Sequence, residues 1–194
     1  MATAPPSPPG PRYEPKPQHA HCSALVEGKW ITYGGFGANG GYADPPTAVD
    51  VFDSAREEWT QMTTSGTPPS GVVSAACVAV GPLLYHIGGA DEGVDYNTVH
   101  CLDTTTMEWR ELQPANPQAA PMKKYGLAGI SYGSIIVTVG GLGDLPTNRH
   151  PGVEYVPDPE SEGKGWTNEV VCYDTEKSEC MCVHLHLHMY YIIL

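Results

Sequence analysis

The sequence predicts an all-β fold: an incomplete ring of about three four-stranded antiparallel blades of the propeller type. A short apolar run that ends in a Gly-Gly pair occurs three times, as VEGKWITYGG, VGPLLYHIGG and YGSIIVTVGG. After each pair and a variable polar stretch comes a second β-rich run that ends in Asp, as AVDVFD, TVHCLD and VVCYD. The pairs are 54 and then 52 residues apart. Such a period, with several short strands per unit, is typical of propeller repeats.

Glycine, aspartate and tryptophan mark corresponding positions in the repeats. Two glycines permit the positive φ angles of a sharp turn, and a tryptophan on the outer strand supplies a large area to bury between blades. The Trp stands six residues after the Asp in the first two repeats, whereas the third repeat has Cys180 there. The expected structural residues of the repeat are Gly34, Gly35, Asp53, Trp59, Gly88, Gly89, Asp103, Trp109, Gly140, Gly141 and Asp174.

Three blades are expected along residues 19–180. They are blade one at about 19–64, blade two at about 71–114 and a partial blade three at about 121–180. Blades one and two each show four candidate strands, but blade three shows only three, within 125–174. The short turns SAREE and TTTME between Asp and Trp suit a hairpin into the outer strand. No segment has helical periodicity.

The two ends of the chain lack the repeat. Residues 1–18 form a Pro-rich leader that we expect to be disordered, because it has little apolar surface to bury. After Glu179 the sequence CMCVHLHLHMYYIIL has no turn residues and no feature of the repeat. We interpret residues 181–194 as a tail outside the repeat. We hypothesise that this tail is translated intron, because a Trp codon interrupted after its first base can give Cys, and Cys-Met-Cys can encode a common intron start.

Charge and composition exclude several classes of partner. The formal net charge is −12 and there is no basic cluster, so we expect neither nucleic acid nor a membrane as a partner. No apolar run has the length that spans a bilayer. The six cysteines show no metal-binding spacing, and four lie in candidate strands, where free thiols behave as small buried hydrophobes. The N-terminus is not a secretory signal. These features predict a cytoplasmic or nuclear protein.

Two motifs suggest a cofactor or a metal, and we assign neither role. The segment GFGANG matches a dinucleotide fingerprint, but Pro45 and Pro46 follow where that site needs a helix. The alternating histidines of HLHLH would share one face of a strand, but they lie in the tail. The remaining histidines have no acidic neighbour at a useful spacing. We therefore expect no enzyme, no cofactor and no metal.

The Gly-Gly pair, the Asp and the Trp six residues later together resemble the kelch repeat, over roughly residues 19–180. The segments PMKKYGLAGISYGSIIVTVGGLGDLP and GKGWTNEVVCYDTE resemble the third blade of the kelch domain-containing protein 2 group. Against the pattern of that group, Thr167 of this chain is an extra residue. This resemblance implies a substrate-recognition subunit of a cullin-2 ubiquitin ligase, which works with elongin and binds peptide C-termini ending in glycine. The alternative is a generic kelch scaffold that binds cytoskeletal or signalling proteins without catalysis.

The resemblance also implies a peptide-binding surface. The long loop from Leu142 to Thr167 is either a contact element or a solvated insertion whose aromatic side chains pack on the blade. If it is a contact element, Trp166 would line the pocket wall and Lys123 or Lys124 would lie near its rim. Arg149, in the same loop, is a further candidate. The residues that grip the terminal carboxylate in that group belong to later blades.

Overall fold

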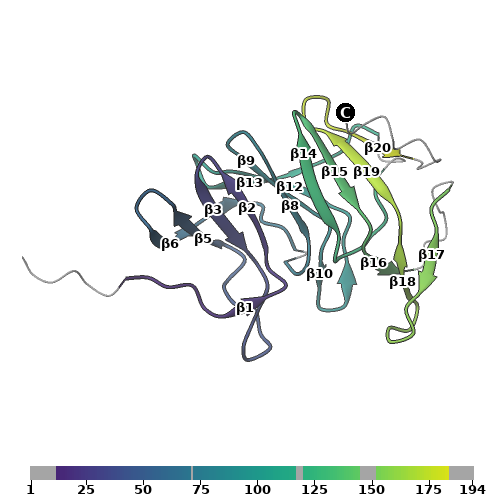
Figure 1. Ribbon diagram of the computed structural model, residues 1–194, viewed down its shortest axis with the longest axis horizontal. Helices are drawn as coiled ribbons and strands as arrows, with labels where there is room; N and C mark the ends of the chain where they lie inside the picture. Colours follow the sequence, from purple (N-terminus) through teal and green to yellow (C-terminus); the bar gives the residue numbers. More distant parts are fainter. Residues whose placement is uncertain (1–11, 71, 117–119, 145–151, 184–194) are drawn as a thin grey trace, which may run out of the picture.

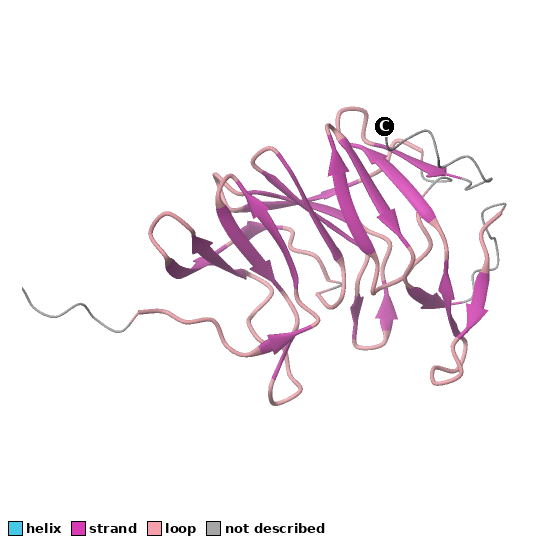
Figure 2. Cartoon of the chain, in the orientation of Figure 1, coloured by secondary structure: helices cyan, strands magenta, loops and turns pink. Residues whose placement is uncertain are grey.

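The structure, a computed structural model, describes residues 12–70, 72–116, 120–144 and 152–183, which form strands, turns and loops but no helix (Figure 2). Within these ranges, therefore, no helix has the length and apolarity that crossing a membrane requires. The described residues form six sheets, and the three larger ones stand side by side in the order of the chain (Figure 1). This arrangement confirms the predicted all-β fold of propeller-type blades.

The first two blades are built as predicted. In blade one the sheet follows chain order, as β2 (Cys22–Val26), β3 (Lys29–Tyr33), β5 (Ala48–Asp53) and β6 (Glu58–Thr63). Blade two likewise has β8 (Ala76–Val80), β9 (Leu83–Ile87), β12 (Val99–Asp103) and β13 (Glu108–Leu112). A fifth short strand, β7 (Ser65–Gly66), pairs in parallel with β13. The linker that leaves blade one is thus bound to the outer edge of blade two.

Blade three also has four strands, which corrects the expectation of a partial blade. They are β14 (Ala128–Tyr132), β15 (Ile135–Val139), β19 (Val170–Asp174) and β20 (Glu179–Val183). Cys180 occupies the Trp position on β20 and is 1% exposed. Asn116, in the linker after blade two, fixes this strand: its Oδ1 accepts the Cys180 N–H at 2.8 Å and its Nδ2 donates to the Cys180 carbonyl at 2.5 Å. Residues 181–183 therefore belong to the blade, and residues 184–194, with the alternating histidines, lie outside the described residues.

Small sheets of two or three short strands project from one side of all three blades, at the bottom of Figure 1. Blade one contributes β1 (Gln18–His19) with β4 (Phe36–Gly37), and blade two contributes β10 (Ala90–Asp91) with β11 (Val94–Asp95). Blade three contributes a three-stranded sheet of β16 (Leu142–Asp144), β18 (Lys164–Thr167) and β17 (Tyr155–Pro157). The expected long loop thus contains three short strands where it is described. We call this side the loop face.

Part of the leader is placed against blade one, contrary to the expectation of disorder over residues 1–18. The Tyr13 hydroxyl donates to the Asp50 carboxylate at 2.6 Å, and Lys16 pairs with Asp44 at 2.9 Å. Burial and the Asp50 carboxylate raise the pKa of Tyr13. These contacts depend on carboxylates of blade one, which composition does not reveal. Residues 1–11 lie outside the described residues.

The apolar core lies between the blades. One cluster joins blades one and two around Ile31, Leu84 and Trp109, and a second joins blades two and three around Tyr85 and Ile136. Successive residues of a strand point to opposite faces of its sheet, so the two middle strands of blade two supply side chains to both clusters. We call these two contacts the seams.

The two repeat tryptophans differ in burial. Trp109 is 1% exposed and its ring lies 5.0 Å from that of Tyr33 in blade one. Trp59 is only half-buried, which corrects the expectation that both rings are largely buried. It contacts Phe52 of its own blade at 5.1 Å. Its side of blade one faces away from the other two blades, so no seam encloses it.

The repeat glycines and aspartates serve the turns and the seams. All six paired glycines have positive φ, between 69° and 112°. At Gly34 an added Cβ would also lie 2.0 Å from the Val72 carbonyl oxygen, so close approach of the next blade requires glycine as well. Asp103 accepts the backbone N–H groups of Thr105 and Thr106 at 2.9 and 3.3 Å. The side chains of Asp53 and Asp174 accept two N–H groups in the same way.

A disulfide between Cys22 and Cys77 crosses the first seam, with the two Cα atoms 5.4 Å apart. It corrects the expectation of free thiols at these positions, whereas Cys101, Cys172 and Cys180 are free. The two cysteines lie on the innermost strands of neighbouring blades and face each other only across the seam. Sequence spacing alone does not reveal that contact.

Replacing Trp109 with Ala should lower the free energy of unfolding by about 3–5 kcal/mol, because it empties part of a packed seam. Trp59→Ala should cost clearly less, since that ring is already half-exposed. Urea denaturation of both variants beside the parent chain measures the difference. Equal losses would contradict the assignment of Trp109, and not Trp59, to a seam.

The stability of the protein should also depend on pH through His86. This side chain is 0% exposed and lies edge-on to the rings of Tyr33 and Trp109, at 5.6 and 6.3 Å. Burial, with a smaller contribution from His100, lowers the pKa of His86 to about 3. An unfolded histidine binds a proton below about pH 6.5. Between that pH and the lowered native pKa, the unfolded state holds the extra proton, so the free energy of unfolding falls by about 1.4 kcal/mol per pH unit as the pH falls.

Thr32 and Thr138 stand at the corresponding position of the other blades, and both are buried. His86→Thr should therefore fit the seam and remove this one histidine's share of the acid sensitivity. Unfolding of parent and variant between about pH 4 and pH 6 tests it, because the carboxylates titrate alike in both proteins. Identical pH slopes would show that His86 is protonated in the native state.

Candidate functional site

Exposed apolar side chains from all three blades lie on the loop face. Tyr42 of blade one is 38% exposed, Val94 of blade two 51%, and Val156 and Trp166 of blade three 61% and 51%. Apolar side chains gathered on one side of a protein are typical of an interaction surface. The loop face is therefore the candidate functional site.

Trp166 lies on β18, the central strand of the three-stranded sheet of blade three. Its Cα partners are Leu142 on one side and Val156 on the other. The neighbouring Gly165 has no room for a side chain, because an added Cβ would lie 2.2 Å from the Tyr155 ring. The hydroxyl of that tyrosine donates to the Gly143 carbonyl at 2.6 Å. These contacts brace the strand, so the indole is presented on a fixed backbone with half of its surface open.

Lys123 reaches the same sheet from the linker before blade three. Its carbonyl oxygen lies 2.2 Å from where a Cβ of Gly143 would stand, and Gly143 is the strand partner of Gly165. The Lys123 side chain is exposed. The structure thus places the exposed Lys123 side chain and the half-exposed Trp166 indole on the same part of blade three. Arg149 lies outside the described residues.

Lys124 is buried, and the rim position predicted for it does not fit the structure. Its side chain is 2% exposed and its Nζ lies 2.7 Å from Oε2 of Glu169, whose side chain is 0% exposed. The contact is an ion pair without an aligned hydrogen bond from Nζ. The same carboxylate accepts the Met122 N–H at 3.2 Å. The Lys124 charge is already matched, so this pair holds the linker against blade three.

Lys164 joins blades two and three at the loop face. Its Nζ lies 2.7 Å from each carboxylate oxygen of Asp95 and 3.6 Å from Asp144, and 5.1 Å from the centre of the Tyr125 ring. Partial burial lowers the pKa of Lys164, but the Asp95 carboxylate outweighs that effect and the pKa is raised. The bridge fixes β18, and with it Trp166, relative to the β10–β11 hairpin.

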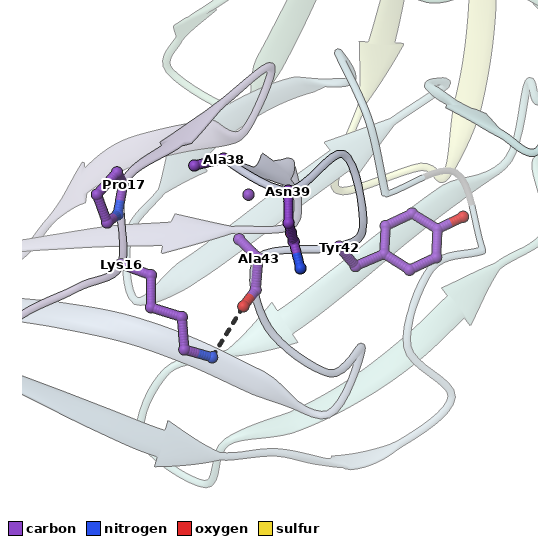
Figure 3. A pocket seen from close by; sticks show the side chains of 7 residues that line it. Lys16, Pro17, Ala38, Asn39, Tyr42 and Ala43 are labelled. Carbon is purple, nitrogen blue, oxygen red and sulfur yellow. Dashed lines mark hydrogen bonds between the residues drawn. The ribbon is translucent and has the colours of Figure 1, made fainter.

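The blade-one part of the loop face contains a hollow of about 400 Å³ (Figure 3). It is lined by Lys16, Pro17, Gly37, Ala38, Asn39, Tyr42 and Ala43. The Lys16 ammonium donates to the Ala43 carbonyl at 3.0 Å. Tyr42 also lines a smaller hollow beside Glu92, and its ring stacks on Phe36 at 5.7 Å. The segment GFGANG supplies part of this wall as strand and turn, so no helix opens there to hold a dinucleotide.

Metal-binding clusters and strongly perturbed titratable groups are further features that can mark a functional site. No group of three or more His, Cys, Asp or Glu side chains in the described ranges is placed to hold a metal. Strongly perturbed groups can mark catalytic sites, but His86 and Tyr33, with a lowered and a raised pKa respectively, are buried in the first seam. Sequence reasoning missed Tyr42 and Val156, because a single aromatic or apolar residue in a variable loop carries no periodic signal.

Lys124→Met should lower the free energy of unfolding by about 3–5 kcal/mol, because the buried Glu169 carboxylate would lose the cation that lies 2.7 Å from it. The double variant Lys124→Met/Glu169→Gln should recover most of that loss, since its glutamine can still accept the Met122 N–H. Urea unfolding of parent, single and double variants measures the coupling. The exposed neighbour gives a matched control: Lys123→Met should change stability by less than about 0.5 kcal/mol. Strictly additive losses would contradict the pairing.

A family model and several known proteins agree with the repeat seen in the structure. Residues 4–141 match the family described as the KLHDC2/KLHL20/DRC7 Kelch-repeats domain. Host cell factor of Drosophila melanogaster is 28% identical over 151 residues, which cover 75% of this chain and 10% of that protein. Kelch domain-containing protein 2 of Bos taurus is 36% identical over 103 residues, covering 53% of this chain and 24% of that protein.

A third relative bears the name of an enzyme. The N-(sulfonatooxy)prop-2-enimidothioate sulfolyase of Thlaspi arvense is 26% identical over 142 residues, covering 64% of this chain and 39% of that protein. In each of these relatives the chain spans well under half of the length. The family match covers blades one and two and ends at the third Gly-Gly pair. With three blades of one architecture and a family match over most of its length, the chain belongs to the kelch-repeat family.

Proposed function

We propose that this protein-interaction module uses its loop face to bind the C-terminal end of a peptide chain. The observation that carries the proposal is Trp166, an indole that is 51% exposed on a braced strand. Aromatic anchors of this kind dominate interface hot spots, because they offer a large contact area at little entropic cost. Lys123 adds an exposed cation in a chain of net charge −12, which suits a terminal carboxylate.

The family relation supports a finer proposal. We propose that the protein is a substrate-recognition subunit of a cullin-2 ubiquitin ligase that works with elongin, in the cytoplasm or the nucleus. In this role it captures its target and leaves the chemistry to the ligase, so it has no catalytic residues, metal or cofactor of its own. The support is the likeness to Kelch domain-containing protein 2, together with the position of Trp166 in the third blade.

A second candidate is a kelch scaffold that binds an internal segment of a cytoskeletal or signalling protein. The burial of Lys124 favours it, because Glu169 neutralises one of the two lysines expected to attract a terminal carboxylate. The hollow beside Tyr42, lined by backbone, amide and aromatic groups, suits an extended internal segment as well as a chain end.

A titration with a glycine-ended peptide should separate the two functions. Trp166→Ala should weaken binding by about 2 kcal/mol, roughly thirtyfold, because it removes the proposed anchor. Met62→Ala is the matched control: Met62 is also an exposed apolar residue, but it lies on the outer strand β6 of blade one and outside the loop face. This control variant should bind like the parent chain.

The same peptide with an amidated end tests the role of the terminal charge. The amidated peptide should bind more weakly, and Lys123→Met should reduce that difference. Equal binding of both peptides would reject recognition of a chain end and favour the scaffold. Equal binding by the parent and Trp166→Ala would reject the anchor itself.

A further inference from the structure

A second, smaller hollow on the loop face crosses the boundary between blades one and two. It has a volume of about 230 Å³ and is lined by Phe36, Gly40, Gly41, Tyr42 and Glu92. Blade one therefore supplies two aromatic rings and a glycine turn, and blade two supplies one carboxylate. We call this site the aromatic–acidic hollow.

The two rings of the hollow are held nearly parallel. Their centroids are 5.7 Å apart and their planes differ by 10°. Phe36 lies on β4, where its Cα partner is His19 of β1, and Tyr42 forms an isolated antiparallel bridge with Phe36. Phe36 is half-buried, whereas Tyr42 is exposed. Backbone pairing thus fixes a flat aromatic surface whose outer ring is open to a ligand.

The turn between the two aromatic residues leaves the hollow open. Its first bonds are internal: the Gly37 N–H donates to the Gly41 carbonyl at 2.7 Å, and the Gly40 N–H donates to the Gly37 carbonyl at 3.0 Å. Gly40 and Gly41 place only backbone in the wall. An added Cβ at Gly40 would meet no atom within 4 Å, so the space beside the turn is free.

The carboxylate of the hollow stands on an anchored hairpin. Glu92 lies in the turn between β10 and β11, with a φ of 46°. Ala90 and Val73 exchange two backbone hydrogen bonds at 2.9 and 3.1 Å, and Lys164 holds Asp95 at the other end of the hairpin. The Glu92 side chain is exposed. Its backbone is thus fixed opposite the rings, while its carboxylate can adjust to a ligand.

The negative charge at this turn has no partner among the cations that the structure describes. Neither Asp91 nor Glu92 takes part in an ion pair there. Oδ1 of Asp91 is buried without a hydrogen bond from any described group. Burial, with a smaller contribution from Glu92, raises the pKa of Asp91. A cation placed beside Glu92 would relieve this unmatched charge.

The lysine of the neighbouring hollow does not supply that cation. The Lys16 ammonium lies 2.9 Å from the Asp44 carboxylate and donates to the Ala43 carbonyl at 3.0 Å. The Tyr42 ring points away from Lys16 (Figure 3). The open ring and the free carboxylate are thus left to a ligand.

We infer that the aromatic–acidic hollow binds the guanidinium group of an arginine in the peptide that the loop face captures. The guanidinium stacks on the Tyr42 ring and pairs with the Glu92 carboxylate. It suits both contacts, because it is planar, stacks on aromatic faces and can donate two parallel hydrogen bonds to a carboxylate. A lysine ammonium is a point charge and lacks this planar fork. The inference rests on the proposed function, in that the ligand is a peptide on the loop face.

Paired peptides test the inference. Each glycine-ended peptide carries one arginine at a chosen distance from its end, and its twin carries citrulline there, which keeps the shape but removes the charge. In fluorescence anisotropy titrations, the best-placed arginine peptide should bind the parent chain about tenfold more tightly than its twin. Equal binding of the twins at every position would overturn the inference, as would absence of binding by all arginine peptides.

A third peptide, with lysine in place of the arginine, tests the stacking. It should bind more tightly than the citrulline peptide but less tightly than the arginine peptide, since it keeps the charge and loses the planar group. A lysine peptide that binds as tightly as the arginine peptide would show that charge alone is recognised. That result would reject the guanidinium as the ligand.

Two variants locate the effect in the hollow. Glu92→Gln and Tyr42→Leu should each bring the affinity ratio of arginine to citrulline peptide close to one. Glu57→Gln is the matched control, because Glu57 is also an exposed glutamate with a positive φ, of 53°, in a turn. It lies between β5 and β6, outside the loop face, and its removal changes the net charge equally. A ratio that persists in Glu92→Gln, or that falls as much in Glu57→Gln, would reject the hollow.

Amidated versions of the peptide pair separate this inference from the proposed function. Amidation removes the terminal carboxylate and leaves the arginine, so the tenfold ratio should persist. If amidation leaves binding unchanged and the ratio persists, recognition of a chain end fails and the arginine site stands. If amidation weakens binding and the ratio is one, recognition of a chain end stands and the arginine site is rejected.

Discussion

The packing of one blade on the next is the interaction on which this structure depends. Each four-stranded sheet has two apolar faces, and a β-sheet is stable only when its apolar face is covered. Blade two meets this condition on both sides, with Leu84 and Trp109 in one seam and Tyr85 and Ile87 in the other. Stability is therefore shared between neighbours, as in other repeat proteins, and no blade carries a core of its own.

The seam tolerates exchange of side chains as long as its volume is filled. Trp109 and Leu102 are cross-strand partners in blade two, and Cys180 and Tyr173 take their places in blade three. The small Cys180 is offset by the larger Tyr173, whose ring lies 6.2 Å from that of Tyr85 across the seam. Exchanges that conserve total volume are those that cores accept best. The bonds from Asn116 to Cys180 then secure the outer strand, so β20 forms without the tryptophan.

The exchange of Trp109 for Cys180 also explains why the sequence predicts some strands more clearly than others. Gly34 and Asp103 act through the local backbone, as a positive φ and as a cap of the following turn, so their spacing predicts the blades directly. The sequence predicts the fourth strand of blade three less clearly, because Cys180 stands where the other two repeats have Trp. The contact of Asn116 with that residue spans 64 positions. Neither period nor composition reveals a contact at that separation.

The residues of the candidate site also differ in how well the sequence predicts their positions. Trp166 stands out in the sequence as an aromatic residue in a long variable insertion, and the structure places it open on the loop face. The sequence does not distinguish Lys123 from Lys124, although one is exposed and the other is buried against Glu169. The Cys22–Cys77 disulfide likewise depends on two strands that meet only across a seam. What the sequence misses in each case is a contact between blades or with a linker.

The loop face takes its geometry from the seams. The Gly89 N–H of blade two donates to the Lys124 carbonyl at 3.0 Å, and the Lys124 side chain is paired with Glu169 of blade three. Lys164 makes a second bridge between the same blades through Asp95. Backbone and buried charges therefore fix where the hairpins of blades two and three stand. Exposed residues of the loop face, such as Trp166 and Val94, contribute little to that packing. These residues can therefore vary with the ligand while the seams keep the arrangement of the blades unchanged.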